Sequence, residues 1–179
     1  MEALSEYLNY FTYAPLPIFV FALLKCWKNI GARWFLTLLI SIECIDIYSY
    51  QYSIEWTTHY YVWSAFMCTL FFVPSFFRRK IALNIYRKTN SKYFLDASKL
   101  DFSQQEAALL LLFFTSMCAN LISYIEILMY KNYIIDVIYF KLYILDKLQL
   151  IIHTLVCLAA LSFAIKPNKG QDYETASDS

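Results

Sequence analysis

The chain of 179 residues contains only two glycines and few charged side chains. Two glycines cannot build the glycine-rich loops that hold phosphates, which excludes Rossmann-type and P-loop nucleotide sites. Charged residues make up 16% of the chain, against about 25% in a typical soluble domain. The formal net charge is +1, so no overall field favours nucleic acid as a partner.

The sequence also lacks the motifs of thiol, metal and nucleophilic chemistry. It has no C-x-x-C, no H-E-x-x-H and no nucleophile motif, so an enzyme is the least favoured class, and neither a metal nor another cofactor is expected. An odd number of widely spaced cysteines argues against a disulfide framework and against structural zinc. We expect free, buried thiols at all five positions, Cys26, Cys44, Cys68, Cys118 and Cys157.

Apolar residues are present in excess. They make up 60% of the chain, against roughly 45–50% in soluble domains, and a disordered chain would show the opposite bias. The first nine residues hold two glutamates and no lysine or arginine, which differs from the basic start of a signal peptide. The composition therefore predicts an integral membrane protein in a lipid bilayer.

The apolar runs predict an all-α, polytopic transmembrane bundle in which residues 1–165 form one domain. Ser103 and Glu106 form a capping box directly before the fourth run and define its start. The stretch 133–165 is too long for one span. It is interpreted either as an outer amphipathic helix at 133–146 followed by a span, or as one long tilted helix. About five spans are expected, at 8–24, 34–52, 58–77, 107–130 and 148–165.

The basic residues predict the orientation of the bundle. Most of the 15 Lys and Arg residues follow the first, the third or the last span, which places the N-terminus outside and the C-terminus in the cytoplasm. The polar tail at 166–179 is expected to be disordered. A bacterial inner membrane and a eukaryotic membrane fit this pattern equally well.

The longest polar stretch begins as a basic continuation of the third span and passes into a loop around Asn90. Its basic residues either contact anionic lipid head groups or only fix the topology of the chain. The residues predicted to contact head groups are Arg78, Arg79, Lys80, Arg87 and Lys88.

Polar residues inside the apolar runs share helical spacing and depth. Glu43, Asp46 and Tyr50 recur at i, i+3 and i+7, which places them on one stripe of the second span. Because ionised acids in hydrocarbon cost at least about 2.5 kcal/mol each, we expect at least one to be protonated, paired or in contact with water. The fourth and fifth spans carry similar groups. The predicted cluster in the outer half of the membrane comprises Glu43, Asp46, Tyr50, Asn120, Ser123, Glu126, Asp146, Lys147, Gln149 and His153.

Three interpretations of this cluster remain open. It forms a hydrated cation or proton site, its members neutralise one another across helices, or it faces a partner helix that supplies the opposite charge. The sequence slightly favours an accessory, assembly or immunity-type subunit that binds other membrane helices. The alternative is a homo-oligomeric cation or proton channel or transporter, because five helices rarely enclose a pore alone.

Overall fold

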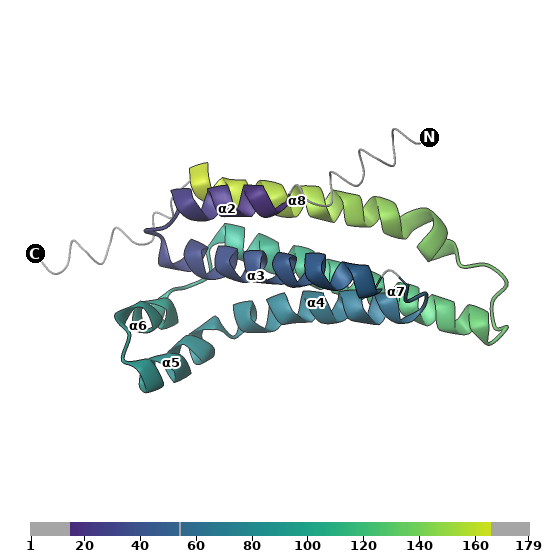
Figure 1. Ribbon diagram of the computed structural model, residues 1–179, viewed down its shortest axis with the longest axis horizontal. Helices are drawn as coiled ribbons and strands as arrows, with labels where there is room; N and C mark the ends of the chain where they lie inside the picture. The colour runs from purple at the N-terminus through teal and green to yellow at the C-terminus, as the bar shows by residue number, and fades with distance from the viewer. Residues whose placement is uncertain (1–14, 54, 166–179) are drawn as a thin grey trace, which may run out of the picture.

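The computed structural model describes residues 15–53 and 55–165, and every regular element in these ranges is helical. Figure 1 shows α2, α3, α4, α7 and α8 extending along the long axis of the molecule, with α5 and α6 folded together at one end. The helices are α2 (Pro15–Lys25), α3 (Ile30–Ser53), α4 (His59–Phe76), α5 (Arg78–Thr89), α6 (Lys92–Lys99), α7 (Gln104–Lys131), the π-helical η1 (Phe140–Leu145) and α8 (Asp146–Ile165).

Two of the described helices are long and apolar enough to cross a membrane. They are α7, with 28 residues, and the 26-residue helix that η1 and α8 form together; α4 and α5 add a third if they are taken as one span bent by 71°. On its outer surface α7 leaves Leu111, Ile122 and Ile125 exposed. Soluble monomers rarely expose apolar faces of this size. The described part of the chain is therefore all-helical, with two or three helices long and apolar enough to cross a membrane.

The long helices form a ring. The packed pairs run in the order α2, α3, α4, α7, α8 and back to α2. However, α2 has only 11 residues, whereas α3 has 24 and α8 has 20. Within the described residues, α2 therefore fills the space between α3 and α8 over less than half the length of α3.

Two apolar clusters stabilise the bundle at different levels. The larger lies toward the α5–α6 end and contains Phe35, Phe71 and Leu109, whose side chains are fully buried. Close helix packing in membranes usually relies on small residues. Because glycine is scarce, alanines with no exposed surface take this role, at Ala22, Ala32, Ala82, Ala97 and Ala160. A smaller cluster around Tyr61, Ala119, Ile127 and Leu145 closes the opposite end.

Several predicted elements lie where the sequence placed them. Helices α3 and α7 cover the predicted ranges 34–52 and 107–130, and α4 falls within the predicted range 58–77. The capping box is confirmed, because Ser103 Oγ accepts from the Glu106 N–H at 3.2 Å and Glu106 Oε2 accepts from the Ser103 N–H at 2.8 Å. The predicted first span is described only from residue 15 onward, and the tail at 166–179 lies outside the described residues.

Two expectations about local structure are met only in part. The basic stretch does continue α4 as a helix and does turn at Asn90, whose left-handed φ is 51°, but α5 is bent from α4 by 71° and a second helix, α6, follows the turn. Asparagine is one of the few residues that adopt this conformation readily. Residues 133–146 do not form a separate amphipathic helix, because the helix that begins at Phe140 continues to Ile165. The structure is thus closer to the single long helix.

All five cysteines are free thiols. Cys26 and Cys68 are buried, and Cys118 and Cys157 are half-buried. Cys44 is exposed on α3, so the prediction of five buried thiols is wrong for this residue.

Candidate functional site

A cavity of about 110 Å³ lies inside the ring, between the two apolar clusters. Its walls come from α3, α4, α7 and α8, and Phe19 of α2 borders it. The volume is sufficient for several water molecules if they find polar partners. The lining residues are Phe19, Leu39, Ile42, Glu43, Asp46, Ser64, Met67, Cys68, Phe113, Ser116, Gln149, Ile152, His153 and Val156.

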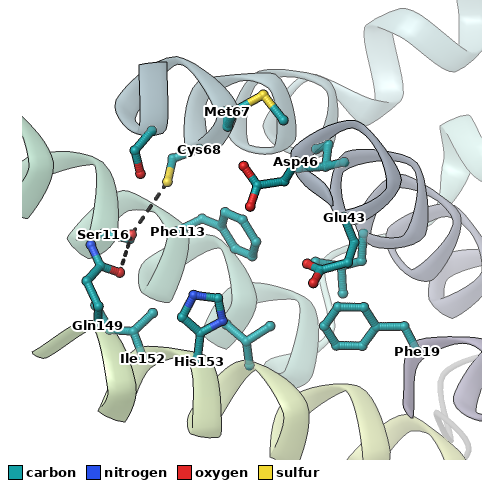
Figure 2. A pocket seen from close by; sticks show the side chains of 14 residues that line it. Phe19, Glu43, Asp46, Met67, Cys68, Phe113, Ser116, Gln149, Ile152 and His153 are labelled. Atoms are coloured by element: carbon teal, nitrogen blue, oxygen red, sulfur yellow. Dashed lines mark hydrogen bonds between the residues drawn. The ribbon is translucent and has the colours of Figure 1, made fainter. Parts of the chain in front are cut away.

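Two carboxylates and an imidazole face one another in this cavity. Figure 2 shows Glu43 and Asp46 extending from α3, with His153 on α8 pointing into the same space. Glu43 is half-buried, whereas Asp46 and His153 are exposed, so the cavity opens at the surface of the bundle. Carboxylates and imidazole are the side chains that most readily exchange protons below and near neutral pH.

Neither carboxylate forms an ion pair with another described residue. Among residues 15–53 and 55–165, the ion pairs are Arg78–Glu106 and Arg79–Asp101, and both involve the α5–α6 end. Among the described residues, Glu43 and Asp46 therefore face the cavity without a lysine or arginine partner. In the same ranges no three His, Cys, Asp or Glu side chains are placed to hold a metal ion.

A row of hydrogen bonds lines the wall opposite α3. Cys68 Sγ donates to Ser116 Oγ at 3.5 Å, and Ser116 Oγ donates to Gln149 Oε1 at 3.1 Å, as the dashed lines in Figure 2 show. Together these bonds join α4, α7 and α8. They engage Cys68, Ser116 and Gln149 with one another, whereas the two acids and His153 form no such bond in this wall.

The structure brings together four of the ten residues predicted to form the polar cluster. Glu43, Asp46, Gln149 and His153 line the cavity. The other six do not border it. Tyr50, Asp146 and Lys147 are exposed. Asn120 Nδ2 donates to the Ser116 carbonyl at 2.9 Å, and Glu126 binds the backbone of η1. Ser123 is fully buried, and its hydroxyl has no hydrogen-bond partner among the described residues.

Glu126 has a structural role in the described chain. Its two carboxylate oxygens accept from the backbone N–H groups of Phe140 and Lys141 at 2.8 and 2.9 Å. These groups lie at the start of η1, where the first N–H groups of a helix have no partner within the helix. Glu126, which lies 14 residues before Phe140 on another helix, therefore caps the start of the last long helix.

Several lining residues were missed by sequence reasoning. Phe19, Met67 and Phe113 line the cavity, but in an apolar run an inward-facing aromatic or methionine looks the same as one that faces lipid. Only the polar residues of the cavity could be recognised in the sequence, by their helical spacing. Cys68 falls within such a run as well, and its role depends on the position of Ser116 on another helix.

Arg78 departs from its predicted contact with lipid head groups. Its side chain is fully buried at the junction of α4 and α5, where Nη1 donates to Glu106 Oε1 at 2.7 Å. Its Nη2 donates to the carbonyls of Leu100 and Asp101, each at 3.0 Å. The prediction is therefore wrong for Arg78, whereas the neighbouring Arg79 is exposed.

Comparison with protein-family models, with curated proteins and with solved structures finds no match to this chain.

Proposed function

We propose that this chain is an integral membrane protein in which α2, α3, α4, α7 and the η1–α8 helix cross the bilayer. The basic residues of the α5–α6 end favour a cytoplasmic position for that end, with the N-terminus outside. The exposed apolar faces of α7 and α8 support this placement, because lipid is the environment in which such faces are stable. Five adjacent helices of one ring then share one membrane.

Within this arrangement, the cavity serves as a binding site for a proton or a monovalent cation. The observation that carries this proposal is the position of Glu43 and Asp46 opposite His153 without an ion pair in the described chain. Acidic side chains at membrane depth are costly, and they are typically retained where they face a cavity or a partner. A pair of acids and an imidazole is suited to taking up and releasing a proton.

A complete transmembrane route requires more than this cavity. Phe19 borders the cavity, and the larger apolar cluster lies between it and the α5–α6 end. We therefore place the route in a homo-oligomer, in which the open side of the cavity faces another copy of the chain. The proposed class is a homo-oligomeric cation or proton channel or transporter.

Flux measured in liposomes tests this proposal. Purified protein should dissipate a pH or potassium gradient, and a variant that combines Glu43→Gln with Asp46→Asn should abolish the flux. Asp136→Asn combined with Asp146→Asn is the matched control, since it also removes two acids but both lie outside the cavity. The control should conduct as the wild type does. Absence of flux in every reconstituted oligomer of the wild type rules out this class.

A second candidate is an accessory subunit of a membrane complex. The exposure of Asp46 and His153 favours it, because an open acidic cavity also suits a lysine or arginine from a partner helix. A pull-down in mild detergent at native expression should then recover a membrane partner in fixed proportion, and neutralising the two acids of α3 should release it. Recovery of this chain alone contradicts the accessory role.

A further inference from the structure

The chain turns sharply where α4 ends and α5 begins. The two helix axes are bent by 71° at Phe77, shortly after Pro74 in the last turn of α4. Phe76 and Phe77 remain 52% and 42% exposed at the bend. Aromatic side chains are common at the boundary between lipid and water. If α4 crosses the membrane, α5 therefore runs across the bilayer surface rather than away from it.

The two faces of α5 differ in charge. Arg78 and Ala82 are buried on the inward face, toward α6 and the bundle. The outward face is formed by three pairs of exposed residues spaced four apart, and four of these six residues are basic. They are Arg79, Lys80, Leu83, Asn84, Arg87 and Lys88.

Little negative charge is available nearby to neutralise the basic face. Of the acids that contact α5, Glu106 is used by Arg78 and Asp101 pairs with Arg79. Asp96 on α6 is the remaining acid of the described α5–α6 hairpin, and it forms no ion pair. Lys80, Arg87 and Lys88 therefore form no ion pair within the described residues, although the Lys80 ammonium lies 5.6 Å from the Phe77 ring centre.

The hairpin is fixed in place from its buried side. The two carbonyls bound by Arg78 connect α5 to the segment between α6 and α7. Helix α6 packs against α3 as well as α5, and the Arg33 guanidinium of α3 lies 4.0 Å from the Tyr93 ring centre of α6. The basic side chains of α5 thus project from a helix whose position is fixed, so a ligand does not have to order the backbone that carries them.

We infer that the outward face of α5 binds the phosphate-bearing head groups of anionic phospholipids in the leaflet that α4 enters. Charge complementarity supports this partner, because a basic helix next to a membrane span lies within the field of an anionic leaflet. The inference requires α4 to cross the membrane, but it is independent of the acidic cavity. A basic segment that only fixes topology has no preference among lipids once the chain is inserted.

Lipid preference can be measured directly with spin-labelled lipids. The full chain is reconstituted in phosphatidylcholine, and the association constant of labelled phosphatidylglycerol is measured relative to labelled phosphatidylcholine. Near an anionic membrane surface, each Lys or Arg side chain raises an association constant about fivefold. We therefore expect phosphatidylglycerol to associate at least about fivefold more strongly than phosphatidylcholine at low salt. Because the Debye length falls to about 3 Å at 1 M ionic strength, high salt should largely remove the preference.

Two charge-matched variants locate the effect. Replacing Lys80, Arg87 and Lys88 by glutamine should bring the relative association constant close to one. Replacing Lys131, Lys141 and Lys147 by glutamine removes the same charge from the opposite end and should leave the preference unchanged. All six substitutions are at positions outside the buried core, and size-exclusion profiles in detergent check that each variant is folded.

Three results overturn the inference. They are equal association of the two lipids with the wild type, a preference that survives in the α5 variant, and an equal loss in the two variants. If the two lipids associate equally with the wild type, a protein partner becomes the candidate ligand of the basic face. Since neither variant alters the cavity, the ion-flux test remains interpretable whichever result is found.

Discussion

Replacing Gly31 with alanine tests whether the buried ion pair between Arg78 and Glu106 holds the α5–α6 end of the bundle together. Gly31 lies in the first turn of α3, and a β-carbon added there would lie 2.5 Å from Glu106 Oε1. This is the same oxygen that accepts from Arg78 Nη1 at 2.7 Å. The substitution therefore displaces the carboxylate without removing any charge.

Gly31→Ala has two opposing effects on the free energy of unfolding, a gain in helix propensity and a loss from the displaced ion pair. Alanine favours a helix over glycine by up to about 1 kcal/mol. Separating a buried pair costs about 3–5 kcal/mol, because each charge loses its partner in a medium that does not solvate it. Arg78 and Glu106 have 0% and 1% of their side-chain surface exposed, so the buried case applies. Partial relaxation recovers some of this, and we expect Gly31→Ala to lower the free energy of unfolding by about 2–4 kcal/mol.

The free energy of unfolding is measured in mixed micelles by titration with sodium dodecyl sulfate, followed by circular dichroism. A double variant, Arg78→Met with Glu106→Leu, supplies the control background, because it has no pair for the alanine to disturb. There Gly31→Ala should be neutral or slightly stabilising. The reasoning is refuted if Gly31→Ala is as stable as the wild type, or if it costs the same in both backgrounds.

Two further substitutions concern single polar contacts. Glu126→Ala should lower the free energy of unfolding by about 1–2 kcal/mol, because it removes the cap of η1. Amide hydrogen exchange should then become faster at Phe140 and Lys141. Unchanged exchange at these two residues would contradict the capping role. Asp101→Asn should cost less than about 1 kcal/mol in the same unfolding titration, because its pair with Arg79 is exposed to solvent; a loss of 2 kcal/mol or more would contradict this weak role.

The adjacent residues Arg78 and Arg79 show what sequence reasoning missed. Both belong to one basic run, and both were assigned to lipid head groups. On α5, which begins after the bend at Phe77, the first arginine is buried and the second is exposed. The direction of a bend depends on how α6 and α7 pack beneath it, and no local pattern in the run records that packing.

Long apolar runs and local motifs were more informative. Helix α7 and its capping box were predicted because both depend on residues close together in the chain. Glu43 and Asp46 were correctly placed on one stripe of one helix, and that stripe does meet His153. Glu126 was assigned to the same cluster by its side of the fourth span and by its depth. Its actual partners lie past a turn, in a helix whose start the sequence did not define.

The position of α3 connects these observations. It does not count among the helices apolar enough to cross a membrane, yet it lies between α2 and α4 in the ring. The two facts are compatible because Glu43 and Asp46 face the cavity, at a level between the two apolar clusters. An acid that faces hydrocarbon costs several kcal/mol, whereas one that faces water, a cation or a partner is largely spared this cost. Hydropathy cannot separate these cases, so a helix that lines a polar site is the one most easily missed.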